Sequence, residues 1–217
     1  MSYDEIGAAR YDDDPEHRLP PEEVETWLAV MTALAGKERP PSRVLDIGAG
    51  TGLLTVALKA AGYAVSGLEP SGPMVERALE RNPALRRHEF VVGASDDAAL
   101  FAAGAFDWIV SRQVLCHLVD PHRVFSAWSG WLRPGGRVLL VDGFWRASDW
   151  PAAERARQPF AAVQSARPVA EALSSVGFEI LRAGPFGELN LARAGIWPGT
   201  TPRYLVAARK GTPATGG

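Results

Sequence analysis

The sequence is poor in cysteine and lacks any long apolar run. Cys116 is the only cysteine, so no disulfide can form within the chain, which fits a reducing compartment. No apolar segment approaches the roughly 20 residues that cross a bilayer. The opening MSYDEIGAARYDDDPEH is polar and acidic, unlike a secretory signal. We therefore expect a cytoplasmic protein without a membrane partner.

An excess of positive charge is also missing. The 217 residues include 23 Lys and Arg against 25 Asp and Glu, which gives a formal net charge of −2. Nucleic-acid binding calls for a basic patch, so we expect no nucleic-acid partner. Cys116, His117 and His122 lack the spacing of a metal site, and we expect no metal. The sequence leaves the oligomeric state open.

What the sequence does contain is an alternation of strand-like and helix-like segments. Apolar strands are predicted at 43–47, 64–69, 88–92, 106–111 and 137–142, with helical patterns between them, including 96–103 and 113–133. Two further strands are predicted at 179–184 and 203–210. This order predicts an α/β protein with a parallel sheet and helices on both faces.

We expect one domain over residues 1–210. Residues 1–39 would form an N-terminal helical cap, and 211–217 a disordered tail. The segments 143–167 and 184–202 are rich in Gly, Pro and aromatic residues, and we expect them to form loops on the substrate side.

The stretch VLDIGAGTG joins the first strand to a helix through Gly48, Gly50 and Gly52. Glycines let a ligand approach the backbone closely, and a helix N-terminus offers N–H donors. The G-x-G-x-G spacing differs from the dinucleotide pattern G-x-G-x-x-G. Asp46 would repel a pyrophosphate but attract a cationic amino group. Glu69 ends the second strand, where an acid can bind both hydroxyls of a ribose. The alternative is a glycine turn that serves packing alone.

Four segments in order, VLDIGAGTG, GLEPS, FDWIVSRQVLCHLVDP and LRPGGRVLLVD, resemble the motifs of class I S-adenosylmethionine-dependent methyltransferases. The resemblance covers roughly residues 40–142 and is closest to small bacterial enzymes that act on small molecules, including natural-product tailoring enzymes. It implies a Rossmann-like, doubly wound, mostly parallel seven-stranded sheet with an antiparallel C-terminal strand. It also implies S-adenosyl-L-methionine as cofactor.

The resemblance further implies which residues bind that cofactor. The glycine turn would hold the methionine portion, the acid after the second strand the ribose, and the segments after the second and third strands the adenine. Tyr11, with Tyr3 as the alternative, would fold over the cofactor. The residues are Tyr11, Asp46, Gly48, Ala49, Gly50, Thr51, Gly52, Glu69, Pro70, Ser71, Met74, Ser95, Asp96 and Ser111.

The fourth strand directs Ser111, Arg112 and Gln113 at the crevice where such sheets bind ligands. Ser111 and Gln113 offer neutral hydrogen bonds. Arg112 could clamp an anionic acceptor or pair with a surface acid. His117 lies four residues after Gln113, so both can share a helix face, and its imidazole could act as a general base. The alternative for His117 is a structural hydrogen bond beside the cofactor.

Aromatic residues suggest a wall for the acceptor pocket. Trp145 directly follows the fifth strand, and we assign it to substrate binding. Trp128 and Trp131 lie at helical positions and are expected in the core.

These observations predict methyl transfer to O or N of a small molecule, with catalytic contributions from Arg112, Gln113 and His117. No Asp/Asn/Ser-Pro-Pro-aromatic element follows the fourth strand, which argues against methylation of nucleic-acid bases or glutamine. Two alternatives remain: a nucleotide-linked oxidoreductase, and a non-catalytic S-adenosylmethionine-binding protein.

Overall fold

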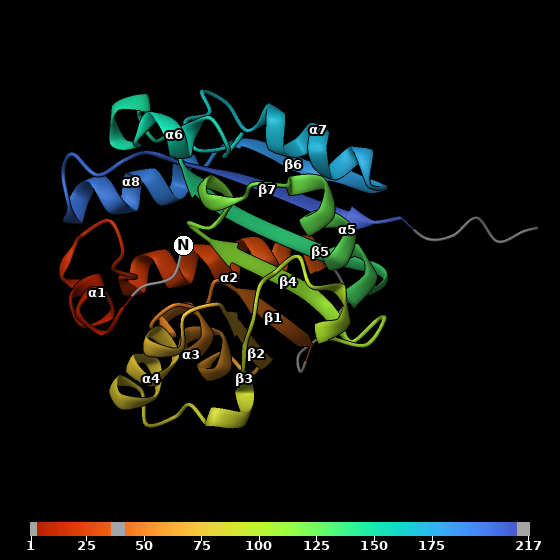
Figure 1. The fold of residues 1–217 in the computed structure, drawn as a ribbon, viewed down its shortest axis with the longest axis horizontal. Helices are drawn as coiled ribbons and strands as arrows, with labels where there is room; N and C mark the ends of the chain where they lie inside the picture. Colours follow the sequence, from red (N-terminus) through yellow and green to blue (C-terminus); the bar gives the residue numbers. More distant parts are fainter. Residues whose placement is uncertain (1–3, 36–41, 212–217) are drawn as a thin grey trace, which may run out of the picture.

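A seven-stranded sheet forms the centre of the protein in a computed structural model that describes residues 4–35 and 42–211 (Figure 1). Its strands run in the order β3-β2-β1-β4-β5-β7-β6. All neighbours from β3 to β5 are parallel, whereas β7 is antiparallel to both β5 and β6. The strands are β1 (Arg43–Ile47), β2 (Ala64–Glu69), β3 (Phe90–Val92), β4 (Phe106–Arg112), β5 (Leu132–Gly143), β6 (Phe178–Pro185) and β7 (Arg203–Lys210). The predicted fold class is confirmed.

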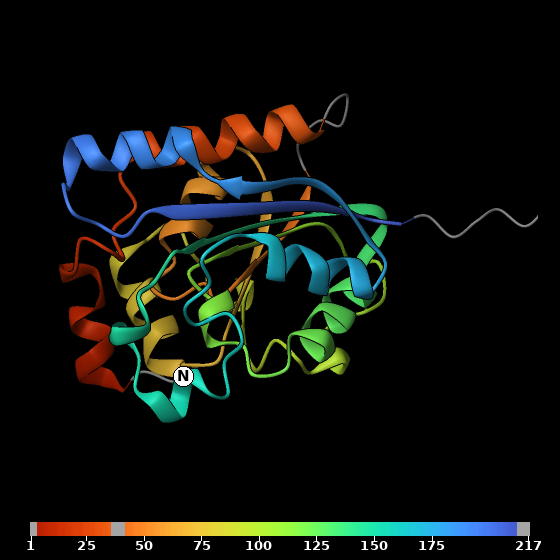
Figure 2. The same cartoon turned by 90° about the horizontal axis from the view of Figure 1, so that it is seen from above.

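Helices cover both faces of this sheet (Figure 2). One face carries α2, α3 and α8, and the other carries α5 and α7, while α4 packs beside β2 and β3. The α-helices are α1 (Glu5–Arg10), α2 (Pro21–Ala35), α3 (Leu53–Ala60), α4 (Gly72–Arg81), α5 (Pro121–Trp131), α6 (Ala152–Arg155), α7 (Arg167–Ser175) and α8 (Gly187–Ile196). Short 3-10 turns are η1 (Tyr11–Asp13), η2 (Arg87–Glu89), η3 (Ala98–Leu100), η4 (Leu115–His117) and η5 (Ala147–Asp149).

The central strands are apolar on both faces because helices bury both. Along β1, Val44 faces the α2 side, whereas Leu45 and Ile47 face the α5 side. In β4, Trp108 faces the α2 side and Ile109 faces the α5 side. This period of two explains why these strands read as nearly continuous apolar runs.

From β1 the strand order runs outwards through β2 to β3, and the chain then returns to add β4 on the other side of β1. Ile47 pairs with Leu68 of β2 on one side and with Ser111 of β4 on the other. The carboxyl ends of these strands therefore lie at the same edge, with Glu69 level with Val92 of β3. Ligands of open α/β sheets bind at such a switch point.

Three predicted elements differ in the structure. The helix expected over 113–133 begins only at Pro121, because Gln113 adopts a positive φ of 59° and Asp120 caps α5. The helical stretch near 96–103 is reduced to η3. The loop expected at 184–202 contains α8, which packs on α2 and buries Leu189.

A buried ion network fastens the N-terminal segment to the sheet. Glu23 of α2 accepts hydrogen bonds from Arg112 Nε at 3.0 Å and from Arg193 Nη1 of α8 at 2.5 Å. Arg203 of β7 donates to Glu16 Oε2 at 2.5 Å. Burial alone would raise the pKa of Glu23, but Arg112 and Arg193 outweigh it and hold that pKa below its usual value. Glu23 is therefore ionised and central to the network.

None of the helices in the described ranges is both long and apolar enough to cross a membrane. The predicted tail at 211–217, apart from Gly211, and the alternative Tyr3 lie outside the described residues.

Replacing Glu23 by Gln should lower the free energy of unfolding by about 3 kcal/mol at pH 7, because two buried guanidinium groups lose their shared carboxylate. Urea denaturation measures this change. Glu171→Gln is the matched control, since the Arg167–Glu171 pair is exposed and its loss should leave the stability unchanged. Equal stability of the Glu23→Gln variant and the wild type would contradict the role of the network.

Candidate active site

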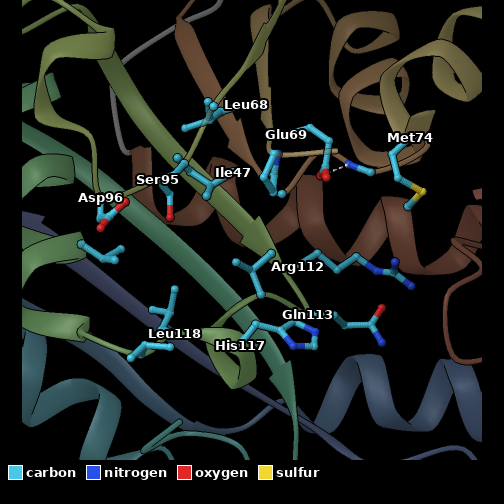
Figure 3. Close-up of a pocket in the computed structure, with 18 of the residues that line it drawn as sticks. Ile47, Leu68, Glu69, Met74, Ser95, Asp96, Arg112, Gln113, His117 and Leu118 are labelled. Atoms are coloured by element: carbon cyan, nitrogen blue, oxygen red, sulfur yellow. Dashed lines mark hydrogen bonds between the residues drawn. The ribbon is translucent and has the colours of Figure 1, made fainter. Parts of the chain in front are cut away.

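A cavity of about 400 Å³ opens at the carboxyl ends of β1, β2 and β4 (Figure 3). Its lining comes from the glycine turn, the start of α4, the loop after β3, and the segment from Arg112 to Val124. Of the residues predicted to bind cofactor or substrate, the cavity brings together Tyr11, Gly48, Gly50, Glu69, Pro70, Met74, Ser95, Asp96, Arg112, Gln113 and His117. The cavity is therefore the candidate active site.

The glycine turn leaves its backbone open to this cavity. Gly48, Gly50 and Gly52 have φ values of 68°, 56° and 78°, a region that side chains disfavour. A Cβ on Gly48 would lie 2.2 Å from Val114 Cγ2. Val114 thus occupies the space that a side chain at position 48 would need, and the positive φ also favours glycine there.

Glu69 is fixed at the end of β2 by two backbone donors. Gly50 N donates to Glu69 Oε2 and Ser71 N donates to Oε1, each at 3.0 Å. A carboxylate has about four acceptor positions, so each oxygen retains capacity for a further donor. Glu69 is buried, lines the cavity and points into it in Figure 3. Two adjacent hydroxyl groups of a ligand would satisfy these oxygens.

Burial raises the pKa of Glu69, and the donors Ser71 N and Gly50 N oppose that increase. The two backbone bonds thus favour the charged form of a carboxylate that has little contact with water. A ligand that donates hydrogen bonds to the Glu69 carboxylate would favour its charged form further.

The loop after β3 is positioned by the two tryptophans expected in the core. Trp128 and Trp131 are buried, and their indole N–H groups donate to Ser95 O and Ala98 O, both at 3.1 Å. Asp96 pairs with Arg123 of α5 at 3.2 Å. Core packing thus extends directly into the cavity wall.

Tyr11 closes the cavity from the N-terminal side. Its ring stacks on His17 with centroids 3.8 Å apart, and His17 Nδ1 lies 2.8 Å from Tyr11 O. His17 is consequently half-buried. The neighbouring Asp12 accepts from Thr51 Oγ1 at 2.8 Å and pairs with Arg81, which joins this segment to the glycine turn.

Several residues predicted to touch the cofactor lie behind the cavity wall instead. Ser111 donates across the sheet to Ile47 O at 3.2 Å and is fully buried. Ser71 caps α4 through Met74 N. The residues outside the lining are Asp46, Ala49, Thr51, Gly52, Ser71 and Ser111. They support the turn and the strand ends.

Asp46 is the most consequential of these. It is buried within the sheet and accepts a 2.6 Å hydrogen bond from Thr55 Oγ1 of α3. Burial raises its pKa to about 7, the Thr55 bond opposes this increase, and the nearby Glu69 adds to it. In this geometry Asp46 holds the first turn of α3 against β1.

Arg112 does not present a free guanidinium to an acceptor. Its Nε donates to Glu23, and its Nη1 and Nη2 donate to His17 O and Arg18 O at 3.0 and 2.6 Å. Of the two readings of Arg112, the geometry favours pairing with an acid, here the buried Glu23: Arg112 holds the N-terminal segment and also lines the cavity.

Gln113 and His117 both reach the cavity, but not from one helix face. Gln113 precedes η4 with φ of 59°, and His117 ends that 3-10 turn. His117 packs edge-on against Trp150, with ring centroids 5.2 Å apart. Burial lowers the pKa of His117, and the Asp142 carboxylate partly opposes this effect. The imidazole is thus neutral at neutral pH.

Trp145 is not part of the cavity lining, and its contact with substrate stays a prediction. Its Nε1 donates to Asp142 Oδ1 at 2.7 Å, and its ring lies under Arg203 at 4.8 Å. Asp142 also accepts from Cys116 N at 3.0 Å, which fixes η4 and hence His117. The sequence signal for Asp142 is an acid that ends a buried apolar strand, and our sequence analysis missed it.

The apolar lining of the cavity was likewise not predicted from the sequence. Ile47, Leu68, Val114, Leu118, Val119 and Val124 line the cavity together with Gly93, Ala94, Asp120 and Arg123. The signal for Leu118 and Val119 was their position directly after His117. Among the described residues, no group of three His, Cys, Asp or Glu side chains is arranged to hold a metal ion.

Comparison with known proteins identifies the class of protein that this geometry defines. A family model described as "Methyltransferase domain" matches residues 17–183, which is most of the chain. The chain therefore belongs to the class I S-adenosylmethionine-dependent methyltransferase family, and the resemblance stated from its motifs is confirmed.

Individual curated relatives match this chain over only part of their length. The ubiquinone biosynthesis O-methyltransferase of Aromatoleum aromaticum is 34% identical over 134 residues, which are 58% of this chain and 52% of that protein. The chain thus spans about half the length of the curated relatives that it matches.

Solved structures share the fold at lower identity. Phosphoethanolamine N-methyltransferase 2 of Haemonchus contortus, solved with S-adenosyl-L-methionine, has a TM-score of 0.70 and 20% identity over 97% of this chain and 58% of its own. A putative sarcosine dimethylglycine methyltransferase of Galdieria sulphuraria has a TM-score of 0.69 and 18% identity, covering 95% of this chain and 98% of its own.

Replacing Asp46 by Asn should stabilise the ligand-free protein at pH 8 by about 1–3 kcal/mol. The folded protein keeps a proton on Asp46 up to about pH 7 that the unfolded chain releases near pH 4, so ionisation makes the wild type less stable as the pH rises through this interval. The Asn variant avoids that penalty. Urea denaturation from pH 4 to pH 8 measures the difference, with the exposed Asp13→Asn as control. A difference that does not grow with pH would contradict the raised pKa.

Proposed function

We propose that the protein transfers a methyl group from S-adenosyl-L-methionine to an oxygen or nitrogen atom of a small molecule. The observation that carries the proposal is Glu69, a buried carboxylate with spare acceptor capacity that faces the cavity beside a glycine turn. A ribose with two neighbouring hydroxyls is the ligand group that suits this carboxylate.

The lining residues fit the rest of that cofactor. Gly48 and Gly50 would hold the methionine portion, since both line the cavity and have no side chain of their own to keep a ligand from the backbone. Pro70 and Met74 would border the adenine, and Ser95 and Asp96 would bind its edge. Tyr11 would cover the bound cofactor from the N-terminal side. Thr51, Gly52, Ser71, Ala49, Asp46 and Ser111 would act indirectly by supporting these groups.

The cofactor supplies an electrophilic methyl group: an acceptor lone pair forms the new bond to carbon, the C–S electron pair returns to sulfur as a neutral thioether, and the acceptor loses a proton. The protein's part is to align the acceptor and to exclude water. His117 is the general base of the proposal, because its lowered pKa leaves the imidazole free to take that proton.

The relatives support both acceptor types. The curated relatives are named as O-methyltransferases, and the Haemonchus structure as an N-methyltransferase. A natural-product intermediate is the acceptor that we infer, because the motifs resemble those of small bacterial enzymes that act on small molecules, which include natural-product tailoring enzymes. We also infer a cytoplasmic setting, which the single buried cysteine supports.

Replacing Glu69 by Ala should weaken S-adenosylhomocysteine binding by about 1–3 kcal/mol, because the ribose loses charge-assisted hydrogen bonds. Isothermal titration calorimetry measures this loss. Glu76→Ala is the matched control, since Glu76 is exposed on α4 and pairs only loosely with Arg87 at 3.8 Å. An unchanged affinity in the Glu69→Ala variant would remove the ribose assignment, and quenching of tryptophan fluorescence by NADH would favour an oxidoreductase.

Replacing His117 by Gln should lower kcat by about 100-fold, the usual contribution of a general base. Wild-type activity should fall as the pH drops below the lowered pKa of the imidazole, and the variant should lose this limb of the profile. His122→Gln on the exposed face of α5 is the control. The assay follows methyl label from S-adenosylmethionine into small molecules of a cell extract. Undiminished turnover by His117→Gln would exclude the base, and no labelled product from the wild type would favour a binding protein without catalysis.

A further inference from the structure

Gln113 is a buried polar side chain without a partner. It is only 7% exposed, and neither its Nε2 nor its Oε1 has a hydrogen-bond partner. Leaving a buried amide unsatisfied destabilises a protein, so such groups are rare in folded chains. Because Gln113 lines the cavity, a ligand bound there is the candidate partner for this carboxamide.

The backbone at Gln113 is also strained. Gln113 is the one non-glycine residue with positive φ in the described ranges, at 59°. Its N–H donates to Val141 O of β5 at 2.8 Å, which holds the strained conformation in place. Strain of this kind is retained where surrounding structure enforces it, and it sets the direction of the side chain.

The hydrogen-bonding groups at the end of the cavity near Gln113 are uncharged. His117 lies on the same side of the cavity as Gln113 in Figure 3, is neutral, and has an unpartnered Nδ1. The arginines of the lining are Arg112 and Arg123, and each is already paired with a carboxylate, Glu23 and Asp96 respectively. An anionic acceptor would therefore find no uncompensated cation.

We infer that Gln113 and His117 form the site that binds the methyl acceptor. This site selects an uncharged molecule that carries a hydrogen-bond donor and a hydrogen-bond acceptor on neighbouring atoms. The carboxamide of Gln113 presents a carbonyl oxygen and an N–H group side by side. A ligand phenol next to a carbonyl or a second hydroxyl can donate its O–H to that oxygen and accept from that N–H, so it satisfies both groups. A carboxylate or phosphate in the same place would be desolvated without compensation. This inference rests on the proposed methyl transfer.

The test compares two pairs of probes that differ in charge: 2-hydroxybenzamide with 2-hydroxybenzoate, and catechol with 3,4-dihydroxybenzoate. Binding to the full chain saturated with S-adenosylhomocysteine is measured by calorimetry. The neutral member of each pair should bind at least about tenfold more tightly. Equal or tighter binding of the anionic members, or no binding of either neutral probe, would overturn the inference.

Gln113→Gly removes the carboxamide and tolerates the positive φ, so the variant should fold. It should bind the neutral probes at least about tenfold more weakly, with S-adenosylhomocysteine affinity within about twofold of wild type. Gln113→Asn, which also tolerates this φ but has a shorter side chain, should show the same direction of change. The exposed Gln164→Gly is the matched control.

Unchanged probe affinity in both Gln113 variants would overturn the inference. If the wild type does not bind S-adenosylhomocysteine, this result would instead contradict the proposed function. Failure of the inference and failure of the proposed function can therefore be told apart.

Discussion

The carboxylate of Glu69 joins two turns that belong to different strands. Through Gly50 N it holds the glycine turn after β1, and through Ser71 N it holds the entry to α4. The parallel register of β1 and β2 brings these groups to one edge of the sheet. The cavity depends on this contact, because the turn, the start of α4 and the carboxylate are three parts of its wall.

The opposite wall depends on a different kind of interaction. Buried arginines compensate Glu16 and Glu23 and hold the N-terminal segment against β4, β7 and α8. Arg112 takes part in this structural network, so its charge is not available to a ligand. The remaining polar groups at this end, Gln113 and His117, are neutral. The network therefore shapes the chemistry of the acceptor side as well as the stability of the fold.

The sequence was sufficient to predict the sheet and the cofactor side of the cavity. The bounds of β1, β2 and β7 agree with those expected from apolar patterning, since strands buried on both faces have distinctive sequences. Gly48 and Gly50 lie in the turn after β1, and Glu69 is the last residue of β2, so strand patterning alone places all three at this edge of the sheet. Their positions are local consequences of the chain, and local patterns reveal them.

Features set by distant partners could not be predicted in this way. Arg112 is occupied by Glu23, and Trp145 by Asp142 and Arg203, and these pairings appear only once the chain has folded. The helix α8 was expected as a loop because the segment 184–202 is rich in Gly and Pro; packing against α2 stabilises the helix. The positive φ of Gln113 has no local signature either.

The most direct test of the central claim is an experimental structure of the protein with S-adenosylhomocysteine. Our account expects both ribose hydroxyls within hydrogen-bonding distance of the Glu69 carboxylate, with the amino-acid portion against Gly48 and Gly50. Density for the ligand away from Glu69, with the glycine turn empty, would contradict the account.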